Sequence, residues 1–283
     1  NPAFILSHGP PVQDSEPNPD SGLGQGVFSV ERNQKSGYAQ QWNLSLQKTY
    51  GQSWSMEAGY LGSKLTNLGV PDVNLNQLTV DQLSLGSFLT EQVPNPFAGQ
   101  IPESSSLGGP TIARQQLLRP CPRFTTVTFY RNNVGHSTYH SAQTRLDRRF
   151  AGGLTFTAAY TFSKLIDDAG AVFDAAILAG PLTSFQAADS RNRRLEKDES
   201  TGSIPHVFAG SAVWDFHGWQ LSGIVRLQSG SPLAVTQATN FNAFAGFGIQ
   251  RPNQVADPFL PADQRTTSRW FNTAAFTSAP QFT

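Results

Sequence analysis

The stretch that decides the fold is Leu154-Thr155-Phe156-Thr157-Ala158-Ala159-Tyr160-Thr161-Phe162-Ser163. Its even positions carry mostly large apolar side chains, and its odd positions carry only Thr, Ala and Ser. A period of two is typical of a β-strand whose two faces meet different surroundings. Residues 154–163 therefore predict a strand with one apolar face.

The same alternation recurs in three predicted hairpins, each closed by a short turn. Their strands are 38–50 with 54–60, 139–150 with 154–163, and 207–216 with 219–228. In the first strand, Tyr38 and Tyr50 bracket three apolar residues, and at a tilt near 45° they would lie roughly 28 Å apart. This is the separation expected of two interfacial aromatic girdles across a membrane.

The other connections are long, at about residues 63–123, 165–204 and 231–283. Short turns at one end of the strands and long loops at the other are typical of outer-membrane barrels, whereas structureless connections this long are uncommon in compact soluble domains. We therefore divide the chain into an extracellular loop segment, 1–25, and a partial β-barrel, 26–283.

Composition supports a membrane barrel over a soluble domain. Charged residues make up 14% of the 283 residues, against about 25% in soluble domains. No apolar run is long enough for a transmembrane helix. The formal net charge is zero, with 20 basic and 20 acidic residues, which argues against a nucleic-acid partner. The single Cys121 cannot form an internal disulfide.

Half-buried strands of soluble sandwiches also alternate, so the membrane interpretation needs further support. It comes from strands of ten to thirteen residues, aromatic residues at the ends of the apolar face, and polar opposite faces suited to a wet lumen. The predicted fold is all-β: an antiparallel transmembrane β-barrel, partial, with about eight strands, and open without the rest of its wall.

Several strings resemble the barrel of Oar-like TonB-dependent outer-membrane receptors, in an order and spacing that cover most of residues 38–276. The strings lie at 41–47, 59–64, 93–99, 118–124, 139–150, 153–154, 159–168, 204–208, 218–224, 228–233, 250–253 and 269–276. The chain departs from the family at Cys121, where an aromatic residue is usual, and at Val207, where Arg is common.

The resemblance implies import of an unidentified solute through the outer membrane of a Gram-negative-type bacterium. Implied partners are outer-membrane lipid, the plug domain of the same full-length protein, and the TonB complex, reached through an N-terminal part. We find no TonB box, plug or closing C-terminal strand and therefore expect a fragment from the C-terminal half of the barrel. Two alternatives remain: a surface-displayed barrel with structural or adhesive loops, and a secreted carbohydrate-binding β-sandwich.

The alternation of side chains assigns candidate residues to the two faces of the predicted barrel strands. Those predicted to face lipid are Trp42, Leu44, Leu46, Leu154, Phe156, Tyr160 and Phe162. Those predicted to face the lumen, where they would contact plug or solute or simply be solvated, are Glu57, Arg145, Asp147, Arg149 and Arg226.

The sequence gives little evidence for a catalytic or a metal-binding site. No nucleophile elbow, phosphate-cradling Gly-rich loop or zinc-protease motif occurs, so we expect neither an enzyme nor a cofactor. Asp167, Asp168 and Asp174 form a weak Ca²⁺ candidate, for which a solvated loop is the simpler interpretation. His136 and His140 have helical metal-pair spacing, but we expect His136 in a turn and His140 at the start of a strand. The charges of 191–199 are balanced in sign, which favours ion pairing or solvation.

Overall fold

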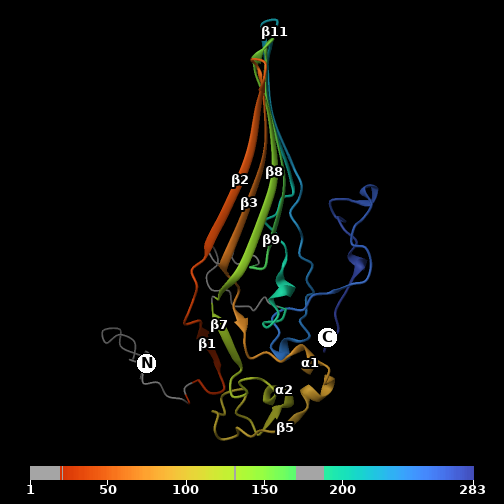
Figure 1. Cartoon of the computed structure of the whole chain (residues 1–283). Coiled ribbons are helices and arrows are strands. Elements are labelled where there is room, and N and C mark those ends of the chain that lie inside the picture. Colours follow the sequence, from red (N-terminus) through yellow and green to blue (C-terminus); the bar gives the residue numbers. More distant parts are fainter. Residues whose placement is uncertain (1–19, 21, 131, 170–187) are drawn as a thin grey trace, which may run out of the picture.

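Six long antiparallel strands dominate the computed structural model, which describes residues 20, 22–130, 132–169 and 188–283. In spatial order they are β2 (Tyr38–Tyr50), β3 (Trp54–Gly69), β8 (Asn133–Ala151), β9 (Leu154–Asp167), β11 (His206–Phe216) and β12 (Trp219–Gln228). We call these six strands the wall. A short strand, β10 (Asp198–Glu199), adds to β9. Each long strand neighbours the next one along the chain, as in an up-and-down barrel (Figure 1).

The three predicted hairpins are confirmed, and all three short turns lie at one end of the wall (Figure 1). Glycines at positive φ make these turns possible. At Gly153, with φ of 80°, an added Cβ would lie 2.3 Å from the carbonyl oxygen of Asp215 in the neighbouring hairpin. The second turn thus needs glycine for both its conformation and its packing.

The strands extend further than predicted at the opposite end. β3 continues to Gly69 and β8 begins at Asn133, so the prediction that His136 lies in a turn is wrong: it lies within β8, opposite Thr66. The ladder continues to Gly69 through a bulge at Asn67, which has φ of 59°. Alternation fades in this part because both faces carry polar side chains, while the backbone hydrogen bonds persist.

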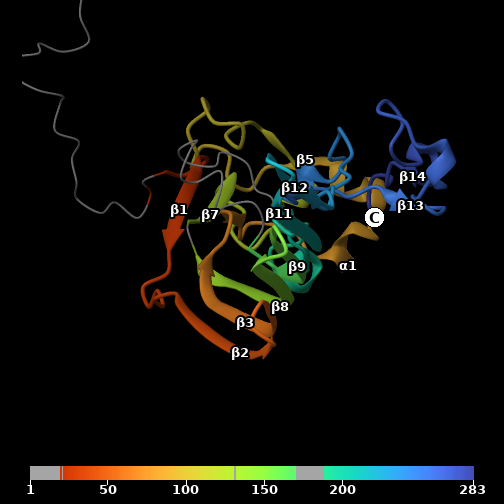
Figure 2. The ribbon, with the colours of Figure 1, turned by 90° about the horizontal axis from the view of Figure 1, so that it is seen from above.

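The wall is an open arc when viewed from above (Figure 2). Its edges are β2 and β12, and both strands are exposed along their whole length. The largest sheet has seven strands including β10, against the predicted eight. Within lipid an unpaired edge leaves backbone groups without partners, so this partial barrel needs further strands to close. A single arc of this kind is not a sandwich of two packed sheets.

The predicted loop 63–123 is largely structured, and we call residues 70–130 the external cap. It contains β4 (Val73–Asn74), α1 (Val80–Leu83), η2 (Gly86–Thr90), β5 (Gln92–Pro94), β6 (Thr111–Ala113), α2 (Arg114–Leu117) and β7 (Thr126–Tyr130). The N-terminal strand β1 (Gly26–Val30) pairs in parallel with β7. Residues 1–19 and 21 of the predicted loop segment 1–25 lie outside the described residues.

Two small hydrophobic cores hold the external cap together. One contains Leu78, Leu83 and Leu89 with Ala245 and Phe247 from residues 229–283, which we call the C-terminal segment. The other contains Leu23, Ile101, Leu107 and Ile112. The sequence did not predict these cores because their apolar residues are scattered without a regular period.

The remaining elements are short. They are η3 (Arg193–Glu196), η4 (Ala243–Ala245), β13 (Asn253–Gln254), η5 (Ala262–Gln264), η6 (Thr273–Ala275) and β14 (Phe276–Thr277). β13 pairs with β14, and we call residues 253–277, which these two strands bound, the C-terminal lobe. The lobe lies beside the wall (Figure 2). In the part of the chain that the structure describes, no helix is long and apolar enough to cross a membrane.

Candidate functional site: the two faces of the wall

The strand register assigns the wall side chains to two faces. Across the sheet, Leu44 lies opposite Tyr60, Tyr60 opposite Ala142, and Ala142 opposite Phe162. All seven residues predicted to face lipid fall on this one face, which we call the apolar face. The second half of the wall extends it with Phe208, Trp214, Trp219, Leu221, Val225 and Leu227.

No other part of the described chain packs over the apolar face, so its apolar side chains are exposed. In a soluble protein such side chains are buried and the polar ones are exposed. Leu46 is 71% exposed and Leu221 is 63% exposed. On β3, the apolar Met56 and Tyr60 are exposed, whereas Ser55 and Ser63 on the opposite face are buried. Large continuous exposed apolar surfaces mark contacts with membrane or partner, because water disfavours them strongly.

Aromatic residues border the apolar face on the side of the external cap. We call this border the outer girdle; it consists of Trp42, Tyr60, His140, Tyr160, Phe162 and His206. Tyr38, which the sequence analysis placed at this border, lies four residues further out than Trp42 on the same face, opposite Thr66. The Tyr60 hydroxyl lies 2.6 Å from Nδ1 of His140, and the Tyr160 hydroxyl lies 2.7 Å from Nδ1 of His206. Such side chains, with an apolar ring and a polar end, suit a membrane interface.

A second border lies near the short turns. This turn-side girdle consists of Tyr50, Trp54, Trp214, Phe216 and Trp219. The Arg148 guanidinium lies 5.3 Å from the centre of the Trp54 ring and donates to the carbonyl of Ala151 at 3.0 Å. The sequence analysis missed Arg148, the one Arg on the apolar face of β8; its place beside the turn puts its charge at the interface rather than in the apolar band.

The opposite face, which we call the polar face, carries the predicted lumen residues. Glu57 lies opposite Arg145, and the same row continues through Ala159 and Ala209 to Arg226. Asp147 lies in a neighbouring row, and Arg149 follows Arg148 next to an irregularity of the β8–β9 pairing. The structure thus brings Glu57, Arg145 and Asp147 together, while two alanines separate Arg145 from Arg226.

Hydrogen bonds connect the groups of the polar face. Arg145 binds Asp147 with two contacts, Nε to Oδ2 at 2.8 Å and Nη2 to Oδ1 at 3.0 Å. The Thr157 hydroxyl donates to the same carboxylate at 2.7 Å. A two-contact pair between guanidinium and carboxylate has a defined geometry that a single ion pair lacks. This network orients Arg145 on a surface open to water.

Apolar residues also occur on the polar face, among them Leu61, Val207 and Val213, and the most exposed of them is Ile224. Ile224 on β12 lies opposite Ser211 on the polar face and is 90% exposed. The sequence analysis did not single it out, although its position two residues before Arg226 gives the signal. An apolar side chain this exposed on a polar face is a place where another part of a protein can pack.

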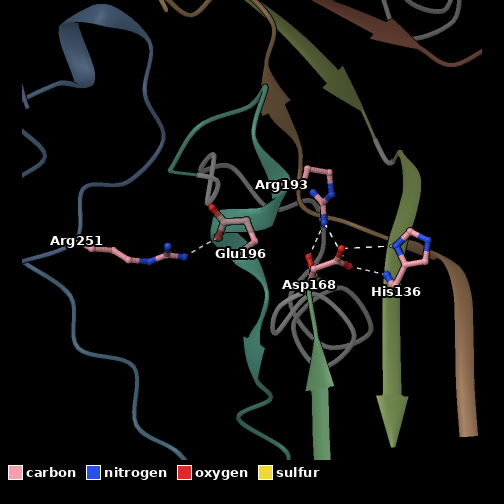
Figure 3. A network of polar contacts seen from close by, with 5 residues as sticks. All are labelled: His136, Asp168, Arg193, Glu196 and Arg251. Carbon is pink, nitrogen blue, oxygen red and sulfur yellow. Dashed lines mark hydrogen bonds and ion pairs between the residues drawn. The ribbon is translucent and has the colours of Figure 1, made fainter. Parts of the chain in front are cut away.

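Asp168 and the charged residues of 191–199, which the sequence analysis singled out, form a network of polar contacts beyond the cap end of the wall (Figure 3). The Asp168 carboxylate accepts the backbone N–H of His136 at 2.5 Å and lies 3.7 Å from the Arg193 guanidinium. Glu196, three residues along, pairs with Arg251 at 2.8 Å. Asp168 and Glu196 thereby attach residues 188–199 to the end of the wall and to the C-terminal segment.

In this network Asp168 joins the end of β9 to β8 and to η3. Asp174 of the proposed Ca²⁺ set lies outside the described residues. Within the described ranges, no three His, Cys, Asp or Glu side chains gather as a metal site. The sequence analysis anticipated ion pairing in 191–199, and Arg193–Asp168 and Glu196–Arg251 are such pairs.

Fold and faces together define the chain as part of a membrane β-barrel wall: an uncovered apolar band between aromatic girdles, with a polar, hydrogen-bonded reverse side. Comparison with known families agrees. The model of the outer membrane beta barrel domain matches residues 1–283, and the chain belongs to this family. It is accordingly an outer-membrane protein of Gram-negative bacteria. No curated protein and no solved structure gives a significant match.

Proposed function

We propose that this chain forms part of the barrel wall of a TonB-dependent transporter, with its apolar face toward lipid and its polar face toward the lumen. The observation that carries the proposal is the polar face itself. It carries charged and polar side chains that are connected by hydrogen bonds, which suits a lumen through which a polar solute passes or in which a plug domain sits. The Oar-like sequence resemblance supports the transporter class.

A plug domain explains two features of the polar face. Ile224 offers an exposed apolar contact, and Arg145 and Arg226 lie on either side of two alanines. Three strand spacings separate these arginines, which is about 14 Å. Arg145 is already paired with Asp147 and lies opposite Glu57, so Arg226 is the cation that an acidic group of a plug would contact. Such a contact stays dissociable, because solvent screens exposed ion pairs.

Cross-linking tests the plug. A photoreactive benzoylphenylalanine replacing Ile224 in the full-length protein should cross-link to a plug segment, identified by mass spectrometry of the digested product. The matched control replaces Leu221, which is exposed on the apolar face three residues away. Cross-links from both positions, or from neither, would contradict the assignment of the faces or the presence of a plug.

The gene provides a second test of the transport step. The full reading frame should encode a plug and a TonB box upstream of this barrel, and the purified receptor should retain the periplasmic domain of TonB. A full-length protein without plug and TonB box would remove the transport proposal and leave the outer-membrane barrel intact.

A surface-displayed adhesive barrel is the second candidate, and the external cap favours it. The cap has its own cores, and Phe28, Phe259 and Trp270 are exposed around it and on the C-terminal lobe. Exposed aromatic residues are common in protein interfaces. Phe259→Ser with Trp270→Ser should reduce attachment of cells to one another or to a surface if adhesion is the function, and should leave it unchanged in a transporter.

A further inference from the structure

A polar pocket of about 280 Å³ opens at the outer end of the wall. Its lining residues are Lys64, His136, Thr138, Ile166, Asp167, Asp168 and Lys197. Lys64, Thr138 and Ile166 are neighbours in one row of the sheet. By alternation this row lies on the apolar face, on the same side as Tyr60 and Phe162. The pocket therefore faces the surroundings of the barrel and not its lumen.

The height of the pocket places it at the level of lipid headgroups. Lys64 lies four residues beyond Tyr60 of the outer girdle and two beyond Gly62, over which the Trp42 ring packs. Measured from the Trp42 row of the girdle, two residues span about 7 Å along a strand, or about 5 Å along the membrane normal at a 45° tilt. Headgroups occupy about 5–8 Å on each side of the hydrocarbon core. The Lys64 amine, carried on a flexible stem, can reach this layer.

The charges of the pocket favour an anion. Lys64 and Lys197 are exposed, and neither forms an ion pair with another of the described residues. Asp167 and Asp168 are two anions in the same pocket, but neither is free. Asp167 has an interaction partner of its own, and the Asp168 carboxylate accepts the His136 N–H and lies beside Arg193. Lys164, opposite His140 on the same face, adds a third cation.

We propose that this pocket binds the phosphate group of an anionic lipid in the outer leaflet. Lys64 and Lys197 supply the positive charge, and the hydroxyl of Thr138 and the imidazole of His136 supply further hydrogen-bonding groups. The acyl chains of the same lipid lie along the apolar face. There, Met56, eight residues from Lys64 on β3, lines a hollow of about 200 Å³ with Ala158, Tyr160 and Phe208. Headgroup and chains thus contact one continuous surface.

Native mass spectrometry of the full-length protein in a maltoside detergent tests this site, with dimyristoyl phosphatidic acid as the probe. The double variant Lys64→Gln, Lys197→Gln should bind the probe about 30-fold more weakly, because each cation near an anionic lipid surface contributes about fivefold. The control, Arg32→Gln with Lys35→Gln, removes two exposed cations outside the pocket and should bind as the wild type does. Lys64→Arg with Lys197→Arg should retain binding.

The comparison probes separate the sources of the phosphate. Dimyristoylglycerol, which lacks phosphate, should not bind, and millimolar inorganic phosphate should not displace phosphatidic acid. Displacement would identify a free-phosphate site and overturn the lipid proposal, as would equal binding by the Lys→Gln variant. The inference rests on the orientation of the apolar face, but not on transport. An intact barrel that fails to bind phosphatidic acid would refute this site and leave the proposed function standing.

Discussion

Asn76, a residue with no exposed surface, joins two segments of the external cap: its own, next to β4, and residues 121–124. Its amide donates to the carbonyls of Cys121 and Phe124 at 2.9 and 2.8 Å and accepts the N–H of Cys121 at 2.8 Å. Its neighbours act similarly: Asn74 contacts Val127 and Gly246, and Gln77 contacts Asp189. Buried amides of this kind replace the regular backbone ladder that a loop lacks.

Asn76→Leu should destabilise the external cap by about 1–3 kcal/mol, because a side chain of similar size leaves the Cys121 N–H without its partner. The Cys121 carbonyl still accepts the Phe124 N–H at 3.1 Å. Phe124 keeps a bond from Gln116 at 2.8 Å, which limits the loss. Urea titration with limited proteolysis of the cap measures the effect. The exposed Asn33→Leu should change stability by less than about 0.5 kcal/mol; a similar effect at both sites would mean that the hydrogen bonds of Asn76 are not responsible.

Arg119 connects the external cap to the C-terminal segment. Its guanidinium donates to the carbonyls of Thr125 and Phe244, both at 2.6 Å. Burial lowers the pKa of Arg119 to about 10. The folded value is thus below the unfolded one, so the charged form carries a burial cost at neutral pH, and the hydrogen bonds offset it. Arg119→Lys should release the 240–247 segment, detected as faster amide exchange there, because lysine lacks the planar fork that spans two carbonyls.

At the scale of the strand, the two faces should respond differently to the same charge. Leu46→Arg or Leu146→Arg, between the two girdles of the apolar face, should cost about 2–4 kcal/mol in a lipid bilayer, whereas Gln143→Arg on the polar face should cost little. Reversible folding into vesicles, followed by the heat-modifiable shift in gel migration, measures these costs. Equal costs on both faces would mean that the apolar face does not contact lipid.

The strand pattern also shows how far the sequence alone could predict the fold. Alternation located all three hairpins, because one face meets an apolar and the other a polar environment. It failed at residues 63–69 and 133–138, where the strands continue beyond the aromatic girdle and both faces are polar. Nor could it find Asn76 or Arg119, because their partners lie up to 125 residues away and follow no period.

At the scale of the whole molecule, the wall separates two very different ends. Three short turns close one end, and the external cap, residues 188–205 and the C-terminal segment cover the other (Figure 1). In outer-membrane barrels the short turns face the periplasm and the long loops face outward. This orientation agrees with the pocket of Lys64 and Lys197 in the outer headgroup layer, because the pocket lies at the cap end.

Cysteine labelling of intact cells should establish the orientation. Thr201→Cys, exposed near the outer end of β11, should react with a large polyethylene-glycol maleimide, and Gln52→Cys in the first short turn should react only after the outer membrane is permeabilised. Both substitutions belong in a Cys121→Ser background, because Cys121 is a free thiol. Labelling of Gln52→Cys alone on intact cells would invert the wall, placing the external cap in the periplasm and the phosphate pocket in the inner leaflet.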